Sequence, residues 1–453
     1  MPDAAQAAAR PRPAQRRLTG TLRLLGWLIA AAAVAQAALF AAILGRTMIL
    51  LPFWDMLSWI DDALCVPGQA GALAYLWKPH NDHHLVLARI LAAIDVPLFQ
   101  GRGVAFVAAA TAATVATAWL IHAEFRRGAG PDPALRASAW LGPMLLLTAA
   151  ASVDCSVPIN AVYPLALLFT VAALALFDGE AERTRATGAR RAAALAAAVL
   201  ASLGNAVGLV AWPALLWSAW QGRASRRWLA AIALLAAGYS FLYTAGLPQG
   251  GMGGTAHLFA PAHLLKMLDY LLAYLGLPLS RAPELGPAAR VLGAVLLLAG
   301  TAAVVRDAAT ARPKARLHRL GTSLVLVALG SALLAAAGRV DLEPEVKVPV
   351  RYAILVAPLH IGLLALALSW RGAAGTPRRQ AGLLGGAAGL AAALLVLQVL
   401  GGRSAVAASD AISATLRRYN DGAREPGMER VVFPDLAEAG RITAALRQRA
   451  GPR

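Results

Sequence analysis

The sequence predicts an all-α, polytopic membrane protein, and three observations lead to that class. Hydrophobic residues fill 58% of the 453 positions, charged residues fill only 15%, and the mean hydropathy is +0.59. The apolar residues gather in long runs, each able to cross a hydrocarbon core of about 30 Å as a helix that rises about 1.5 Å per residue. Short arginine and lysine clusters separate the runs, as orientation signals do. Lipid is therefore the main solvent of this chain.

The first apolar run, residues 22–44, follows a basic flank with four arginines between residues 10 and 17. Such a flank is also typical of a secretory signal. The run is longer than the apolar core of a signal peptide, however, and many further spans follow. We therefore expect a cytoplasmic basic N-terminus at residues 1–21 and an uncleaved anchor.

Nine further apolar segments follow, and the fifth is unusual. Basic residues at 190–191 and 223–227 bracket it, so both of its ends favour the cytoplasm. Gly204 and Asn205 interrupt its middle, and we expect a short helical hairpin there, which brings the total to about eleven membrane helices. Broken helices at membrane depth are tolerated where they face protein or a watery cavity. The nine segments are residues 103–123, 137–153, 158–177, 191–220, 228–246, 287–305, 320–338, 351–370 and 381–400.

The basic residues also predict the orientation of the chain. A net charge of +18 would indicate a nucleic-acid partner in a soluble protein, but here the charge recurs between apolar runs, and we expect no nucleic acid. The loops nearest the spans carry more basic residues on the side of the N-terminus. We therefore expect a transmembrane domain at residues 22–400, with its first loop, residues 46–102, facing outward. Residues 401–453 would form a small external helical tail, with amphipathic stretches at 405–419 and 434–448.

The first external loop contains the first candidate site residue, Asp55, in the sequence PFWDMLSWIDD. A carboxylate just outside a span can act as a base on an acceptor hydroxyl or help to ligate a divalent cation. A helix cap or a solvated acid is the simpler alternative. Asp61 and Asp62 follow, and on a helix Asp55 and Asp62 share a face because two turns separate them. Adjacent acids are also typical of a solvated face.

The run HNDHH at residues 80–84 is the second candidate. His80 and His84 have the four-residue spacing that places two imidazoles on one side of a helix, as zinc sites require. The neighbouring Pro79 and Asn81 are typical of a turn or a helix start. A metal site is therefore only one interpretation of the run.

Phosphate binding is the other interpretation, and we favour it. Imidazolium groups, Lys78 and the free amides at the start of a helix at 85–94 can all attract an anion. Asn81 and Asp82 would otherwise cap that helix. Counting the interrupted segment as well, the residues assigned to acceptor or donor binding are Asp61, Asp62, Lys78, His80, Asn81, Asp82, His83, His84 and Asn205.

A third group of candidates lies in GRVDLEPEVKVPVRY, residues 338–352. Arg339, Lys347 and Arg351 stand here at the predicted outer mouth of two spans. Ionisable residues near bilayer level are costly, and the guanidinium fork suits phosphate oxygens, so we assign these three residues to a lipid phosphate. Alternatively, Arg351 snorkels from its span and pairs with an acid of the same segment.

The two cysteines, Cys65 and Cys155, both fall on the predicted oxidising face. They could pair there, but the sequence does not establish the short Cα separation of a disulfide, and we expect two unpaired thiols. No CxxC spacing supports zinc binding.

In their order, these motifs resemble a known family. An outward loop with an aromatic-flanked acid, LWKPHNDHH and ARILAAIDVPLFQGRG are followed by NAVGLVAWPALL and GRVDLEPEVKVPVRY. Over most of residues 20–400 this order resembles a broad group of bacterial polytopic proteins. That group is similar to the GT-C superfamily of membrane glycosyltransferases, and distantly to protein O-mannosyltransferases and lipid A aminoarabinose transferases. The E-x-D acids common in the superfamily are not clearly present, which leaves a divalent cation open and no metal ligand assigned.

The resemblance implies an enzyme of the bacterial inner membrane. It would move a sugar from a polyprenyl-phosphate donor to an envelope glycan or lipid acceptor on the external face, among membrane lipids. Asp55 matches the catalytic acid of the first external loop by its distance from the first span, and the hairpin with Asn205 is similar to a broken helix pair of the superfamily. The alternatives are a transporter or flippase for lipid-linked or polar solutes, and a noncatalytic subunit of an envelope-synthesis complex. Transporters commonly contain internal repeats, and the sequence shows no convincing repeat, which favours the transferase.

Overall fold

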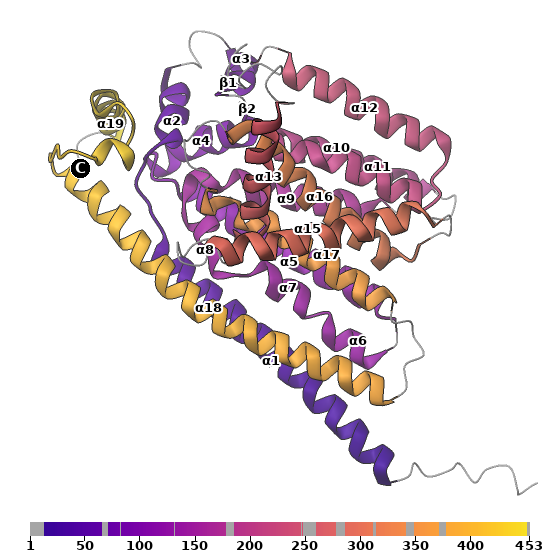
Figure 1. The fold of residues 1–453 in the computed structure, drawn as a ribbon. Helices are drawn as coiled ribbons and strands as arrows, with labels where there is room; N and C mark the ends of the chain where they lie inside the picture. Colours follow the sequence, from indigo (N-terminus) through magenta and orange to yellow (C-terminus); the bar gives the residue numbers. More distant parts are fainter. Residues whose placement is uncertain are drawn as a thin grey trace, which may run out of the picture.

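The computed structural model is almost entirely helical (Figure 1). Within the part of the chain that it describes, the strands are the two-residue β1 (Pro79–His80) and β2 (His83–His84). The all-α class is therefore confirmed. The described residues are 13–65, 71–81, 83–130, 132–177, 185–245, 247, 260–277, 286–310, 314–340, 348–370 and 377–450.

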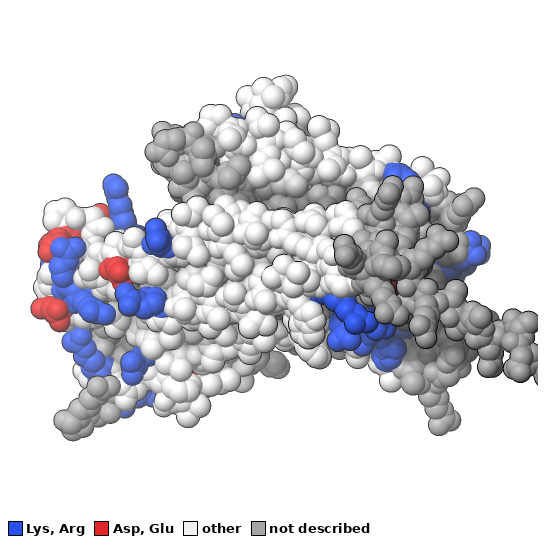
Figure 2. All heavy atoms as spheres, turned by 90° about the horizontal axis from the view of Figure 1, so that it is seen from below, with Lys and Arg blue, Asp and Glu red and all other residues white. Residues whose placement is uncertain are grey.

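Eight helices among these residues are long and apolar enough to cross a membrane, or nine if one bent pair counts as a span. Figure 2 shows charged side chains gathered toward two ends of the molecule, with a broad uncharged band between them. Exposed side chains on the span helices are large and apolar, such as Trp119 (69% exposed) and Phe241 (76%). These features indicate a membrane-embedded protein. The helices that provide the spans are α1 (Pro13–Thr47), α5 (Val104–Gly128), η2 with α9 (Pro158–Asn160 and Val162–Leu176), α12 (Arg226–Thr244), α15 (Gly286–Ala308), α16 (Arg316–Arg339), α17 (Ala353–Trp370) and α18 (Pro377–Asn420).

One difference from the expected eleven helices lies at residues 137–153. The chain there forms α6 (Pro133–Ser138), α7 (Leu141–Leu146) and α8 (Ala149–Ser156), with a bend of 49° before α8. The Gln36 side chain of α1 donates hydrogen bonds to the carbonyl oxygens of Met144 (2.6 Å) and Leu147 (3.1 Å) at the break. Backbone groups freed inside a membrane need such internal partners.

The other difference lies at residues 191–220. The chain forms α10 (Arg185–Gly204), the 3-10 turn η3 (Ala206–Val210) and α11 (Ala211–Gln221), none of which passes as a full span. The predicted interruption is present, because α10 ends at Gly204 and Asn205 caps η3 through its side chain. The count of about eleven spans stays a prediction.

The long helix α18 lies beside α1 along one side of the molecule (Figure 1). Its 44 residues continue through residue 401, where we expected the transmembrane domain to give way to a tail. The glycines at 401–402 do not end the helix. The missing side chain at Gly402 instead allows α18 to pack closely on α1, because a Cβ there would lie 2.6 Å from Ile43. The C-terminal segment, η7 (Met428–Arg430) and α19 (Leu436–Ala450), matches the predicted amphipathic stretch at 434–448.

Short helices cover one end of the spans. They include α2 (Asp55–Cys65), α3 (Gly71–Trp77), α4 (Val86–Phe99), α13 (Pro261–Leu275) and η6 (Val350–Tyr352). Cys155 of α8 is a buried free thiol whose Sγ lies 3.1 Å from the Thr114 hydroxyl, so it forms no disulfide. The side chain of Cys65 lies outside the described atoms.

Candidate functional site

A cavity of about 490 Å³ lies under the short helices, where segments far apart in the sequence meet. That volume is typical of a small-molecule site. Its walls come from the start of α2, the β hairpin, η2, η3, the last turns of α16, and η6. The residues that line it are Asp55, Trp59, His80, Asn81, His83, Leu85, Ile159, Asn160, Val162, Tyr163, Asn205, Ala206, Val207, Leu334, Ala335, Gly338, Arg339, Arg351 and Tyr352.

Asp55 and His80 lie together at one wall of this cavity. The Nε2 atom of His80 lies 3.4 Å from Oδ1 of Asp55, and the side chains are 13% and 38% exposed, respectively. Trp59, one turn after Asp55 on α2, meets the His80 ring edge-on with its centroid 5.8 Å away. A carboxylate beside an imidazole at the wall of a cavity can accept a proton from a bound hydroxyl.

The histidine run folds as a hairpin, so the helical arrangement considered for His80 and His84 does not form, whereas the turn indicated by Pro79 and Asn81 does. His80 pairs directly with His83 across the two strands, and Pro79 pairs with His84. The turn forms because Asn81 adopts a left-handed φ of +49°, which asparagine tolerates better than most residues. Directly paired residues share one face, so His80 and His83 both line the cavity.

His84 therefore lies on the other face of the hairpin, away from the cavity. Its ring stacks on Trp77 with centroids 4.4 Å apart, and its Nδ1 lies 2.7 Å from the Trp77 carbonyl oxygen. Burial lowers the pKa of the His84 imidazole, and the nearby Arg89 adds to that effect. The alternative role of Asn81 as an N-cap is not formed, because Leu85 occupies the N-cap of α4. Asp82 lies outside the described residues.

Two arginines form the cationic part of the cavity. Arg339 ends α16 and Arg351 belongs to η6, and their guanidinium carbons lie 5.7 and 5.9 Å from the centre of the Tyr352 ring. The Arg351 Nε is buried and has no hydrogen-bond partner among the described residues. Lys347 and the neighbouring acids lie outside the described residues. Among the described residues that line the cavity, Asp55 is the only carboxylate, so the two arginines give this set of side chains a net positive charge.

This arrangement also sets the protonation of Asp55. Burial raises the pKa of its carboxyl group, but the hydrogen-bonding and charge effects of His80, with the charges of Arg351 and Arg339, outweigh burial and hold the pKa below the ordinary value. Asp55 is therefore an ionised acceptor over a wide pH range.

Asn205 brings the break between α10 and α11 to the cavity wall. Its side-chain oxygen accepts a hydrogen bond from the Val207 N–H (3.1 Å), and the following turn folds back against α10. Gly208 makes this possible, since a Cβ there would lie 1.9 Å from the Ala201 carbonyl oxygen. The broken segment thus faces a cavity, as expected of irregular backbone at membrane depth.

Asp62 and Lys78 do not line the cavity, although the sequence assigned both to it. Asp62 accepts a hydrogen bond from the fully buried Arg89 (2.6 Å) and forms an ion pair with Lys78. Asp55 and Asp62 do lie on one helix, α2, but the partners of Asp62 direct it to a separate ion-pair network. A buried arginine needs such a carboxylate. Asp55 and Asp62 therefore do not form the two-carboxylate arrangement that their spacing allows.

Asp61 contacts the C-terminal segment instead. Arg441 of α19 donates two hydrogen bonds to its carboxylate, at 2.9 and 3.0 Å. The same segment holds Trp54, the residue before Asp55: the Trp54 backbone N–H donates to Val432 (2.7 Å) and its indole N–H donates to Arg430 (3.0 Å). Trp54 has a φ of +49°, which is strained for a bulky residue and needs such support.

Sequence reasoning missed several cavity residues. Asn160 and Tyr163 line the wall, and Tyr352 packs between Tyr163 and Tyr274, with both pairs of ring centroids 5.5 Å apart. The signal was present as polar residues inside an apolar run, VDCSVPINAVYP, where Asn160 donates to the buried Asp154 (3.4 Å). Polar groups within apolar segments are expensive and tend to be functional.

Two further observations concern metal binding and similarity to known proteins. In the part of the chain that the structure describes, no group of three or more histidine, cysteine, aspartate or glutamate side chains is arranged to hold a metal ion. Comparison of the chain with protein-family models, curated proteins and solved structures finds no match. The chemistry of the cavity therefore provides the evidence for function.

Proposed function

We propose that the protein is a GT-C-like membrane glycosyltransferase that moves a sugar from a polyprenyl-phosphate donor to an envelope glycan or lipid acceptor outside the cell. One observation carries the proposal: Asp55, His80, Arg339 and Arg351, which are spread over nearly 300 positions, line a single cavity. A base beside phosphate-binding cations is what transfer from a phosphate-linked sugar requires.

A lipid-linked donor suits this cavity because its walls are both charged and apolar. Leu334 lines the cavity and is also 39% exposed on the apolar outer surface of α16. A polyprenyl chain can pass along that side into hydrocarbon while its phosphate meets the arginines. Arginine binds phosphate oxygens through paired hydrogen bonds, and the Nε of Arg351, which has no partner among the described residues, supplies one donor.

The proposed transfer is a substitution at the anomeric carbon of the donor sugar. The acceptor hydroxyl oxygen forms the new bond to that carbon, and its proton passes to the Asp55 carboxylate. The bond between the carbon and the phosphate oxygen breaks, and the phosphate leaves with the bonding electron pair. Arg351 and Arg339 would stabilise the charge that develops on the leaving phosphate. His80 keeps Asp55 ionised before the step.

A second candidate is a flippase or transporter for lipid-linked solutes. The broken segment at Asn205 favours it, because interrupted helices at the cavity wall are common in transporters. The acid beside a histidine has no evident task in such a protein, which favours the transferase.

The decisive assay incubates the purified protein, reconstituted in membranes, with radiolabelled polyprenyl-phosphate sugar and a cell-envelope acceptor. The transferase yields labelled product. Movement of label across the membrane without product identifies a flippase, and neither result identifies a noncatalytic subunit; both outcomes contradict the proposal.

A further inference from the structure

A second hollow, of about 610 Å³, lies between α1, α5, α6 and the start of α18. The two ends of α16 show where this hollow lies relative to the cavity. Gly128, at the end of α5, packs against Leu317 at the start of α16, whereas the cavity lies at the last turn of that helix, at Arg339. Since 24 helical residues span about 36 Å, the two hollows lie at opposite ends of the helices. We call this second hollow the basic groove.

The basic groove is lined by cations from three helices. Arg23 comes from α1, Arg126 from α5 and Arg136 from α6, and His122 lies beside them. No carboxylate is among the described residues that line it, and all three arginines are exposed. This composition differs from an ordinary surface, on which both signs are interspersed.

The carboxylates nearest in sequence have partners other than the three groove arginines. Glu124 forms ion pairs with Arg127 and Arg316. Asp132 caps α6 by accepting from the Ala134 N–H (2.8 Å), and its second oxygen accepts from Gln380 (3.4 Å).

The arginines of the groove are correspondingly unneutralised. Arg23 and Arg126 form no ion pair with any residue that the structure describes, and Arg136 donates its Nε to the Gly130 carbonyl oxygen (2.7 Å). An anion from outside the chain can therefore occupy the space between them.

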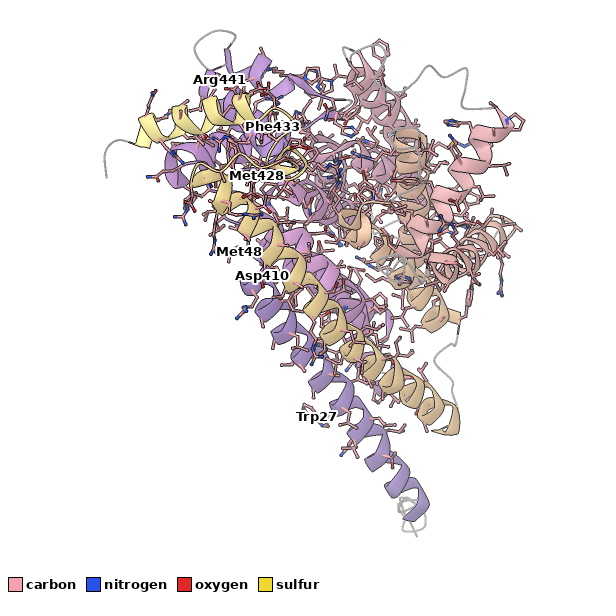
Figure 3. All side chains as sticks on the ribbon, turned by 60° about the vertical axis from the view of Figure 1, so that its left-hand side comes forward. Trp27, Met48, Asp410, Met428, Phe433 and Arg441 are labelled. Carbon is pink, nitrogen blue, oxygen red and sulfur yellow. The ribbon has the colours of Figure 1, made fainter. Side chains whose placement is uncertain are left out.

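Apolar walls complete the groove. Trp27, on the membrane span α1, is 75% exposed and lies toward the end of the helix remote from Arg441 (Figure 3). Trp140 packs against His122 with its ring tilted by 36° and the ring centroids 4.1 Å apart, and the buried Leu384 of α18 also lines the groove. Tryptophan is typical of the boundary between lipid headgroups and hydrocarbon. Cations beside such a boundary suit a molecule that has an anionic head and an apolar tail.

We propose that the basic groove binds an anionic glycerophospholipid. Its headgroup phosphate lies among Arg23, Arg126 and Arg136, and its acyl chains run along Trp27 and the exposed face of α1. Basic pockets between membrane helices bind anionic headgroups in this way. A soluble phosphate would use the arginines but not the apolar wall. The assignment is independent of the chemistry of the cavity, because no residue is shared between the two hollows.

Lipid retention tests the assignment. The full-length protein is placed in nanodiscs of phosphatidylcholine with a minor fraction of phosphatidylglycerol, extracted into detergent, and examined by native mass spectrometry. The groove variant combines Arg23→Gln, Arg126→Gln and Arg136→Gln. The control combines Arg190→Gln, Arg226→Gln and Arg227→Gln, which removes the same charge from exposed residues outside the groove. We expect retained phosphatidylglycerol to fall at least five-fold in the groove variant and by less than two-fold in the control.

Equal retention in the groove variant and the native protein would overturn the proposal, as would equal loss in both triple variants, which indicates a general charge effect. Trp27→Ala provides a test that folding does not confound, because this side chain is 75% exposed, and it should lower retention at least two-fold; unchanged retention counts against a lipid. Excess inorganic phosphate should leave the lipid bound, whereas its complete displacement would assign the groove to free phosphate.

Discussion

The two ends of the molecule use arginine in different ways. In the cavity, Arg339 and Arg351 stand with Asp55 and His80, so that cations and a proton acceptor share one space. In the basic groove, three arginines line a hollow, and no carboxylate is among the lining residues that the structure describes. A charge of one sign can hold a ligand, whereas a base beside cations can also change one. Whether a site can bind a ligand or also react with it therefore depends on whether a proton acceptor lies beside the cations.

The largest effect should follow the loss of Arg351. Arg351→Gln removes a charge-assisted contact worth about 1.5–3 kcal/mol, so we expect the KM for the lipid-linked donor to rise about ten- to a hundred-fold. Initial-rate kinetics with radiolabelled donor measure the change. The control is Arg290→Gln, which breaks an ion pair with Asp269 outside the cavity and should leave KM unaltered. A KM that does not respond to Arg351→Gln would remove the phosphate from this position.

His80→Gln should change the pH dependence of transfer. Asp55 accepts a proton only when ionised, and His80 lowers its pKa, so the native protein should keep the base ionised below the ordinary value of 3.8. Without His80 the pKa of Asp55 rises, and activity should be lost at a higher pH on the acidic side. The dependence of kcat/KM on pH reports this limb. His84→Gln, on the far face of the hairpin, should not move it; a shift of the same size there would contradict the assignment.

The C-terminal segment should have a smaller effect on the cavity. Asp61→Arg breaks a partly exposed ion pair worth at most about 1 kcal/mol, so transfer should fall by less than about five-fold. Amide hydrogen exchange at Trp54 should quicken, because its N–H bond to Val432 loses support. Adding Arg441→Asp re-forms the pair with reversed charges and should restore both quantities. A double variant no better than the single one would show that the ion pair does not act through Trp54.

The smallest effect on transfer should come from the basic groove. Its triple glutamine variant should change the rate in detergent by less than about two-fold, because distant sites without shared partners behave independently. Transfer rates of the groove variant and of its matched surface control provide the comparison. A loss of ten-fold or more confined to the groove variant would join the two ends into one functional unit.

The predictability of this protein from its sequence differs between its parts. Long apolar runs such as 103–123 predicted spans well, because lipid requires a long helix whose backbone groups are satisfied internally. Asp55 and Arg351 were found because charge near a membrane boundary is costly. Residues 137–153 were expected as one helix but are broken. The break was not predicted because the side chain that satisfies it, Gln36, comes from a distant helix.

The wrong predictions share a physical cause. The spacing of His80 and His84 fits a helix equally well, and only the turn conformation of Asn81 produces a hairpin. Asp62 was expected in the cavity, but a buried partner, Arg89, lies 27 residues later and directs it elsewhere. Local periodicity carries no information on such distant partners, so the choice between neighbouring acids could not be made from the sequence.

The most direct test of the account compares two aspartates of the same helix. Asp55→Asn and Asp61→Asn each remove one charge from α2, but only Asp55 lines the cavity. In reconstituted membranes with radiolabelled polyprenyl-phosphate sugar, we predict that Asp55→Asn lowers transfer at least about a hundred-fold, as loss of a general base does, while Asp61→Asn stays within about five-fold of the native rate. Full transfer by Asp55→Asn would contradict the central claim.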